Sequence, residues 1–328
     1  MDDVDGRGAA PGSRTRVVFA YGAAAAMVPY LLIKVSWVVG GLSGLVEVGE
    51  EFSLAGWVLL NAVTIVMAAT GIVLGLALAR PWGRRIPALP LLACAWIGSG
   101  FLVPMLPYLL VGSLAGGNGG ATGGDGSTMP VWEAVLIDVG FAGLGLGLAV
   151  ALPIYLRERW PAAFQGRVRK GPPGGRSGVA AATMTAVLGV LQLVWAAGGT
   201  LGLAQPEFAD PDWRLLTGNA GVWALVAAAC AFALTSGRVP GLPRWIPVTL
   251  GWVSSGFLFA WSCWKLPLVG YLAVAAEQAN RWPENLGVAG AQAVVGVVAG
   301  AATLAVVVRA VRGRGEARRR VEPCGRVE

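Results

Sequence analysis

The chain has 328 residues, of which 55% are hydrophobic and 13% charged, against roughly 25% charged in a typical soluble domain. It contains no histidine, no Cys-x-x-Cys pair and no Walker A sequence. These absences argue against histidine-based haem, zinc and hydrolase sites, a dithiol redox motif and an internal ATPase. The net charge of +7 comes from arginines spread over loops that flank apolar segments, so we do not interpret it as nucleic-acid binding.

Eight apolar segments of about 20 residues or more follow one another, and each can cross the roughly 30 Å hydrocarbon core of a bilayer as a helix. Nearly all are apolar around the whole helix, which is typical of lipid-facing segments. The alternation of a β-barrel is absent. The sequence therefore predicts an all-α polytopic membrane protein with eight transmembrane helices, at residues 17–41, 54–79, 86–112, 131–156, 179–203, 217–236, 246–272 and 286–308.

The first apolar segment raises the alternative of a cleaved signal peptide, because it follows Arg7, Arg14 and Arg16. Its apolar run is longer than the core of a signal peptide, and no clear Ala-x-Ala cleavage site closes it. We therefore interpret the segment as a retained first helix.

Basic residues fall in alternate loops, and this bias predicts the orientation. With the N-terminus inside, 21 of the 25 Lys and Arg residues lie in cytoplasmic segments, whereas the outer loops contain Arg214 and Arg281. The positive-inside rule then places both termini in the cytoplasm. The 22 arginines against three lysines, with abundant Ala and Gly, suggest a bacterial plasma membrane. Tryptophans mark the predicted membrane boundaries, with Trp57, Trp132, Trp213 and Trp282 outside and Trp82, Trp160 and Trp245 inside.

The chain also repeats itself, with an offset of 158 and later 156 residues. The matched pairs are Trp37 and Trp195, Gly40 and Gly198, Gly44 and Gly202, Asn61 and Asn219, Arg80 and Arg238, Trp96 and Trp252, Ser99 and Ser255, and Gly100 and Gly256. This order predicts two parallel four-helix repeats related by a pseudo-two-fold axis along the membrane normal. The predicted parts are a cytoplasmic tail (1–16), repeat 1 (17–160), a cytoplasmic Gly/Pro linker (161–178), repeat 2 (179–309) and a basic cytoplasmic tail (310–328). We expect residues 1–13 and 312–328 to be disordered, and residues 113–130 to form a flexible outer loop.

The stretch Trp195-Ala-Ala-Gly198-Gly199-Thr-Leu-Gly202, before Pro206, resembles the first helix and outer loop of a family of small four-span bacterial membrane proteins of unknown function. The resemblance covers about a dozen residues in each half. The first copy departs from it, because no proline follows its glycines. The resemblance implies a tandem duplication of a four-helix unit and implies no activity.

Polar side chains within the spans predict a site, because charge in hydrocarbon is costly. Lys34 and Asp138 are expected at similar depth in the outer half, which would allow an ion pair. The repeat aligns Lys34 with Gln192 and places Asp138 near Gln292. We expect a polar vestibule that opens to the outside near the axis between the repeats. Its predicted residues are Lys34, Asp138, Asn61, Asn219, Gln192 and Gln292.

The alternative for these polar residues is a set of interhelical hydrogen bonds that hold the helices in register. Lys265 is expected to extend its ammonium to the interface. Glycine pairs such as Gly71-x-x-x-Gly75 and Gly296-x-x-x-Gly300 predict close approach of helices. Prolines in the third and seventh spans predict matching kinks, at Pro87, Pro90, Pro104, Pro107, Pro247 and Pro267.

Three classes of function remain open. The duplication, the prolines and the outer-half charges favour a transporter or channel for a small polar solute. Short loops favour an accessory or regulatory protein that binds a membrane-protein partner within the bilayer. An intramembrane enzyme would need Asp138 or Glu133 as general base without histidine, and we expect neither enzymatic activity nor a cofactor.

Overall fold

A computed structural model describes residues 11–45, 53–114, 130–168, 176–236, 238–274 and 280–321 of the chain. Among these residues, eight helical segments are long and apolar enough to cross a membrane, in agreement with the predicted all-helical membrane fold. The chain divides into two compact units. The first comprises Met1–Ala95 and Gly120–Arg159, and the second comprises Trp96–Gly119 and Trp160–Glu328.

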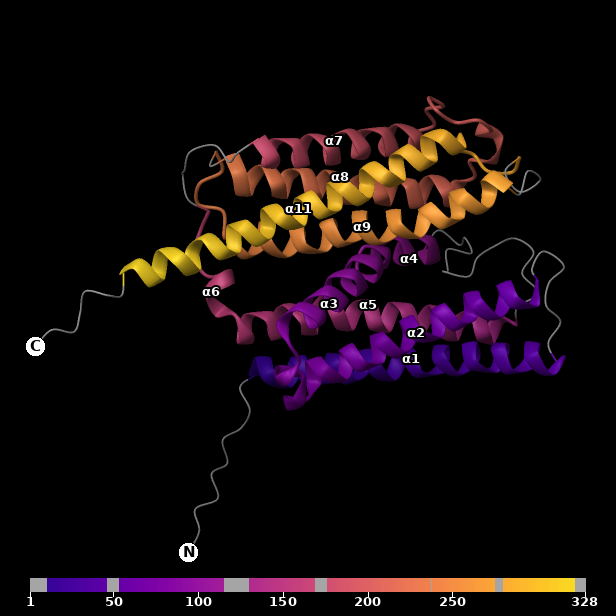
Figure 1. Ribbon diagram of the computed structural model, residues 1–328, viewed down its shortest axis with the longest axis horizontal. Coiled ribbons are helices and arrows are strands. Elements are labelled where there is room, and N and C mark those ends of the chain that lie inside the picture. Colours follow the sequence, from indigo (N-terminus) through magenta and orange to yellow (C-terminus); the bar gives the residue numbers. More distant parts are fainter. Residues whose placement is uncertain are drawn as a thin grey trace, which may run out of the picture. The chain divides into compact units, whose positions relative to one another are not determined.

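Each unit is a set of helices packed side by side (Figure 1). In the first unit, α1 packs against both α2 and α5. In the second unit, α7 packs on α8, α8 on α9, α9 on α11 and α11 on α7, which closes a four-helix bundle. The helices of the spans are α1 (Pro11–Ser43), α2 (Leu54–Ala79), α3 (Ala88–Leu102), α4 (Met105–Leu114), α5 (Val131–Arg159), α7 (Arg176–Ala196), α8 (Pro211–Ser236), α9 (Trp245–Val274) and α11 (Leu286–Val321).

The fifth span ends at Ala196, before the predicted end at residue 203. Gly198 has a φ of +98°, which glycine adopts without strain, and the amide of Gly199 donates to the carbonyl of Val194 at 2.8 Å. This arrangement closes the last turn of a helix. In turn, α8 begins earlier than predicted, at Pro211, because the carboxylate of Asp210 accepts a hydrogen bond of 2.7 Å from the amide of Trp213.

The third span is broken in its C-terminal half. α3 ends at Leu102, α4 begins at Met105, and Pro104 between them is buried. Proline has no N–H, so a carbonyl one turn earlier loses its helical partner. The side-chain amide of Asn219 in α8 reaches the break and donates to the carbonyl of Pro104 at 2.9 Å. The seventh span has no corresponding break, since α9 continues through Pro267.

Small residues bring the helices of the first unit together. A Cβ atom on Gly75 of α2 would lie 3.0 Å from the carbonyl oxygen of Ala20 in α1. Cβ atoms on Gly143 and Gly147 of α5 would collide with the methyl groups of Ala26 and Ala23. The predicted packing role of glycines is therefore confirmed at this interface.

The basic end of the first unit is tied together by Arg16, whose side chain is only 9% exposed. Its guanidinium donates to the carbonyl of Leu78, near the C-terminus of α2. It also forms an ion pair of 3.2 Å with Glu158 of α5, and Glu158 lies 3.2 Å from Arg84. A cation at a helix C-terminus opposes the negative end of the helix dipole, so Arg16 stabilises α2 as well as binding α5.

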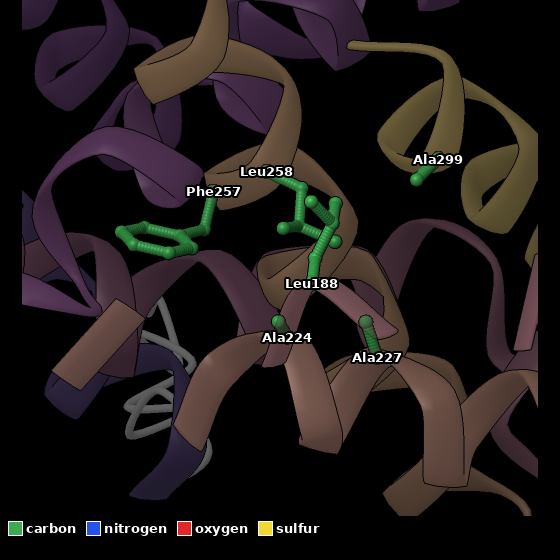
Figure 2. Packing of buried hydrophobic residues seen from close by; sticks show 6 residues of the cluster. All are labelled: Leu188, Ala224, Ala227, Phe257, Leu258 and Ala299. Carbon is green, nitrogen blue, oxygen red and sulfur yellow. The ribbon is translucent and has the colours of Figure 1, made fainter. Parts of the chain in front are cut away.

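Helix packing in the second unit leaves an apolar core that the inner surfaces of all four bundle helices share (Figure 2). α9 and α11 approach closely, because a Cβ atom on Gly300 would lie 2.7 Å from the carbonyl oxygen of Ser255. The predicted role of the Gly296-x-x-x-Gly300 pair is confirmed here. The core residues are Leu188, Ala224, Ala227, Phe257, Leu258 and Ala299.

The C-terminal half of α3 also belongs to the second unit and crosses α9 at two glycines. A Cβ atom on Gly100 would collide with the backbone of Gly256, and one on Gly256 would lie 2.5 Å from the carbonyl oxygen of Trp96. The indole N–H of Trp96 donates to the hydroxyl of Ser255 at 3.0 Å. Backbone-to-backbone contact of this kind requires glycine on both helices.

The prediction of disordered tails is wrong in part, and the predicted linker has local structure. The predicted linker contains a single helical turn, α6 (Pro161–Phe164), followed by a β-bridge between Arg167 and Pro243. This bridge holds the linker against the loop that precedes α9, while residues 169–175 lie outside the described residues. At the termini, α1 begins at Pro11 and α11 continues to Val321, so both helices extend from the spans into the tails that were predicted to be disordered. Residues 1–10, 115–129 and 322–328 are also outside the described part.

Candidate functional site

A cavity of about 260 Å³ lies among the four bundle helices of the second unit. Its walls are mostly aromatic and aliphatic, and its polar groups gather where the loop before α11 meets α9 and α11. Pockets of this composition, between helices of a bundle, are typical binding sites for small molecules. The lining residues include Gln192, Trp213, Trp261, Lys265, Trp282, Glu284 and Gln292.

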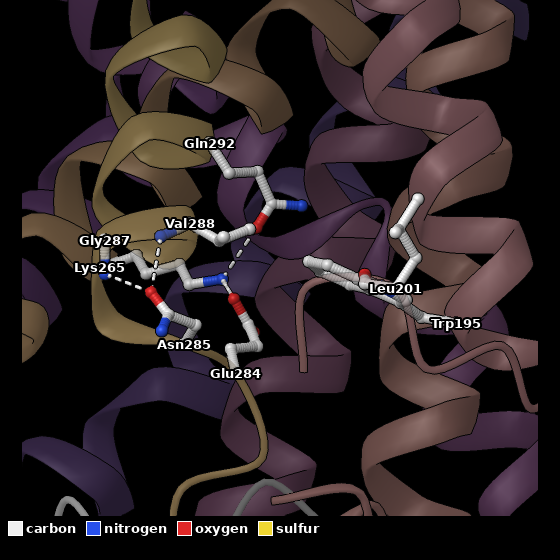
Figure 3. A network of polar contacts seen from close by, with 8 residues as sticks. All are labelled: Trp195, Leu201, Lys265, Glu284, Asn285, Gly287, Val288 and Gln292. Carbon is white, nitrogen blue, oxygen red and sulfur yellow. Dashed lines mark hydrogen bonds and ion pairs between the residues drawn. The ribbon is translucent and has the colours of Figure 1, made fainter. Parts of the chain in front are cut away.

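An ion pair between Lys265 and Glu284 is the polar centre of the site (Figure 3). The Lys265 ammonium donates to the two carboxylate oxygens of Glu284 at 2.8 and 2.6 Å, and to Oε1 of Gln292 at 2.9 Å. These three bonds use all three N–H groups of an ammonium. The Glu284 side chain is 5% exposed and that of Lys265 is 23% exposed, so the pair is largely removed from solvent.

The position of Glu284 is set by a short stretch of extended backbone. Glu284 forms a β-bridge with Leu203, and the amide of Asn285 donates to the carbonyl of Gly202 at 3.2 Å. Gly202 has a φ of +82°, which allows the α7–α8 loop to turn there. Trp195, 1% exposed, fixes the same loop through a 2.7 Å hydrogen bond from its indole N–H to the carbonyl of Leu201.

The start of α11 places Gln292 two turns into the helix. The side chain of Asn285 accepts hydrogen bonds from the amides of Gly287 and Val288, at 2.9 and 3.3 Å, and so caps the helix (Figure 3). An ammonium can only donate, so the atom of Gln292 that faces Lys265 must be the carbonyl oxygen. The Nε2 amide of Gln292 therefore points away from Lys265, toward the side on which Trp195 lies (Figure 3).

Three polar atoms of the site are buried and have no hydrogen-bond partner among the described residues. They are Nε2 of Gln292, Nε1 of Trp282 and Oε1 of Gln192. Gln292 is 8% exposed as a residue, so solvent has little access to it. A buried polar group without a partner costs about 1–3 kcal/mol. All three atoms have almost no accessible surface, so they lie within the wall of the cavity rather than on its surface.

The aromatic wall of the cavity is held from outside by the third span. The indole N–H of Trp261 donates to the carbonyl of Phe101 at 3.2 Å, and the two rings stack with centroids 4.6 Å apart. On α8, Trp213 packs against Trp195 with centroids 6.1 Å apart. Because these rings are anchored by neighbours behind them, their faces toward the cavity have fixed positions.

Of the six residues predicted for the site, the structure places Gln192 and Gln292 on this one cavity. Asn219 lies in the same unit, with its amide on the carbonyl of Pro104, which is an interhelical hydrogen bond. Asn61, 2% exposed, donates to the carbonyl of Trp57 one turn earlier in its own helix. The amide of Asn61 therefore braces α2 in the first unit.

The remaining two predicted residues, Lys34 and Asp138, also belong to the first unit. The Lys34 ammonium lies 3.8 Å from the ring centroid of Trp37 and 5.7 Å from that of Tyr30, which are cation–π distances. Glu133, in the first turn of α5, acts on the same ammonium electrostatically. The ion pair between Lys34 and Asp138, and a vestibule between the two repeats, stay predictions.

Sequence reasoning missed Glu284 and misjudged Lys265. Lys265 was expected to extend to the interface, whereas its ammonium is bound to Glu284 and Gln292 inside the unit. The positions of these two residues in the sequence could have indicated the pair. Glu284 is a carboxylate two residues before the eighth span, and Lys265 is a lone lysine near the C-terminal end of the seventh. Opposite charges at adjoining ends of consecutive helices favour a pair.

No protein-family model, curated protein or solved structure matches the chain. The interpretation of the site therefore depends on its own geometry.

Proposed function

We propose that the protein is a transporter or channel of a bacterial plasma membrane and that the cavity of the second unit binds its solute. The observation that carries this proposal is a cavity among the helices of a bundle whose spans can cross a membrane, with the largely buried Lys265–Glu284 ion pair and Gln292 in its wall. A few fixed polar groups within mostly apolar walls are typical of a small-molecule site.

The proposed orientation has both termini in the cytoplasm. It is supported by the position of the arginines in each unit. Arg16 and Arg84 lie at one end of the first unit, and Arg238 and Arg309 lie at the end of the second unit opposite to Glu284. The positive-inside rule then puts Glu284 and the adjoining end of the cavity on the outer side.

The proposed duplication has local support in both units. Trp37 and Trp57 stack with centroids 5.8 Å apart in the first unit, and Trp195 and Trp213 lie 6.1 Å apart in the second. Gly44 and Gly202, which the offset of 158 matches, have φ values of +70° and +82°. We infer that the two repeats insert the same way up, as in transporters with parallel repeats.

The proposal is tested by the accessibility of a single thiol in the cavity. Ser262 lines the cavity, and the next residue along α9, Cys263, is exposed on the bundle surface. One variant carries Ser262→Cys with all four native cysteines replaced by alanine. The control variant keeps Cys263 as its single thiol. Both are treated with a membrane-impermeant thiol reagent on intact cells and on inverted membrane vesicles.

A transporter exposes the cavity to each side in turn, so we expect the thiol at position 262 to react from both sides and Cys263 to react from neither. Reaction from the outside alone would favour a receptor or an accessory protein that binds its ligand without moving it. An unreactive thiol at position 262 in both preparations would refute the proposal and leave a structural network.

A further inference from the structure

A groove of about 610 Å³ runs along the surface of the second unit between α7 and α8, which pack side by side (Figure 1). A Cβ atom on Gly178, near the start of α7, would collide with Thr235 of α8, so the start of one helix touches the end of the other. Most of the side chains that line the groove are small. They include Ala182, Ala186, Ala228 and Ala229, with Phe232 and Arg238.

The groove covers about the depth of one leaflet of a bilayer. Its α7 residues begin at Gly178, two residues after the helix starts, and end at Val187. At about 1.5 Å per residue they span roughly 14 Å, close to half of the roughly 30 Å hydrocarbon core. The large apolar side chains of the groove, Val179, Val187 and Phe232, are exposed. In a bilayer, exposed apolar side chains on a spanning helix contact acyl chains, so lipid has direct access to the groove.

One end of the groove is basic. Arg238, which follows α8, lines the groove and is exposed, and no described carboxylate lies within ion-pair distance of it. Arg176 is the first residue of α7, and Arg309 of α11 donates to the hydroxyl of Ser177 at 2.9 Å. Three arginines therefore gather where α7 begins, and the N-terminus of that helix adds partial positive charge.

The described part of the chain has no spare anion for this end. The described carboxylate at the basic end of the first unit, Glu158, already pairs with Arg16 and Arg84. A second copy of the chain, inserted the same way up, would therefore bring no unpaired described carboxylate to Arg238. A membrane supplies phosphate at this depth, and arginine binds phosphate through two parallel hydrogen bonds. The described carboxylates of the second unit all lie in or beside the loops at the opposite end, at Glu207, Asp210, Asp212 and Glu284.

We propose that this groove binds an anionic phospholipid, with the headgroup phosphate on Arg238 and one acyl chain along the small residues between α7 and α8. Charge selects the headgroup, and the small side chains leave room for the chain. This inference is independent of solute transport through the cavity. Only the leaflet depends on the proposed orientation, in which Arg238 lies on the cytoplasmic side.

The test compares phosphatidylglycerol with phosphatidylcholine of identical acyl chains. Their dissociation constants are measured by native mass spectrometry on the purified full-length protein in detergent. We expect phosphatidylglycerol to bind roughly fivefold or more tightly, because each basic residue at the surface favours an anionic headgroup by about that factor. Arg238→Gln should remove most of this preference. The matched control, Arg281→Gln, removes the same charge from an exposed arginine at the opposite end of the second unit and should leave the preference unchanged.

A second pair of variants tests the apolar part of the site. Ala229 is exposed and lines the groove, so Ala229→Leu fills part of the groove without disturbing a packed interface. This change should weaken the binding of both lipids several-fold and keep the ratio of their constants. The matched control is Ala180→Leu, at an exposed position of α7 outside the groove, and it should change neither constant.

Equal affinity of the unmodified protein for the two lipids would overturn the inference. Equal effects of Arg238→Gln and Arg281→Gln would also overturn it, because they would indicate a diffuse effect of net charge. If Ala229→Leu keeps full affinity for phosphatidylglycerol, the anion binds outside the groove, as a free phosphate could, and the acyl-chain site is wrong. Loss of a dimer in Ala229→Leu, without any preference between the lipids, would instead assign the groove to a second copy of the chain.

Discussion

The ammonium of Lys265, in the C-terminal part of α9, lies 2.6 Å from one carboxylate oxygen of Glu284, a residue of the loop that precedes α11. Nineteen residues separate the two in the chain, and the pair ties consecutive helices together beside the cavity. Because Gln292 accepts the third hydrogen bond, one ion pair fixes both the loop and the amide that the site presents.

Removal of one partner of this pair should be costly. In Lys265→Met, Glu284 stays 95% buried without its cation, and we expect a loss of about 3 kcal/mol in unfolding free energy. At about 2–4 °C per kcal/mol, the thermal midpoint in detergent should fall by roughly 6–12 °C. The double variant Lys265→Met/Glu284→Gln removes both charges and should recover most of this loss. Equal destabilisation by the single and the double variant would contradict a coupled pair.

A methyl group at the crossing of α3 and α9 should also destabilise the protein. Gly100→Ala places a Cβ against the backbone of Gly256, where no flexible side chain can move aside. We expect a loss of about 1–3 kcal/mol, measured as the thermal midpoint of the purified variant. The matched control is Gly270→Ala, in α9, where nothing lies within 4 Å of the new Cβ. This control should be neutral or gain up to about 1 kcal/mol from helix propensity.

Loss of one indole N–H should weaken the loop between α7 and α8. Trp195→Phe removes the 2.7 Å hydrogen bond to the carbonyl of Leu201, and we expect a cost of about 1–2 kcal/mol in unfolding free energy. Trp252→Phe is the matched control, because the buried indole nitrogen of Trp252 has no partner among the described residues. The midpoint of the control should therefore change less. If both variants behave alike, loss of ring volume rather than of the hydrogen bond explains the effect.

The orientation predicts opposite labelling of two loops. In a background without native cysteines, Gln165→Cys marks the predicted cytoplasmic linker and Thr200→Cys marks the loop after α7, which also borders Glu284. An impermeant thiol reagent should label position 200 on intact cells and position 165 in inverted vesicles. Labelling of position 165 on intact cells would reverse the membrane orientation and place the Glu284 end of the cavity on the cytoplasmic side.

The length and apolarity of the segments were sufficient to predict the eight spans. In hydrocarbon, a helix satisfies all backbone hydrogen bonds within one segment, so each long apolar segment is expected to be helical. The bounds of α2, Leu54–Ala79, agree with the predicted segment at both ends. Hydropathy did not predict where the fifth span ends, since Gly198 and Gly199 are compatible with an apolar run and only the backbone conformation of Gly198 ends the helix. The third span contains four prolines, and the sequence does not indicate that the helix breaks at Pro104. The break also depends on a hydrogen bond from Asn219, which is more than 100 residues away in the chain.

The candidate site was predictable only in part. Gln192 and Gln292 were found because polar side chains are rare within spans, and the structure places both on one cavity. Glu284 was missed because it lies in a loop, where a carboxylate is ordinary, and its burial results from the bridge to Leu203. Pairing between a loop and a helix end is a property of the tertiary structure, so neither hydropathy nor the repeat could reveal it.

The path of the third span has a consequence for how this protein could be divided. Its N-terminal residues, up to Ala95, belong to one compact unit, and its residues from Trp96 onward belong to the other, where Phe101 supports the ring of Trp261. A polypeptide that starts at Trp160 would contain every lining residue of the cavity and yet lack the segment that holds one of its walls. Two half-length chains produced together should complement each other, whereas the C-terminal half produced alone should be poorly folded around Trp261.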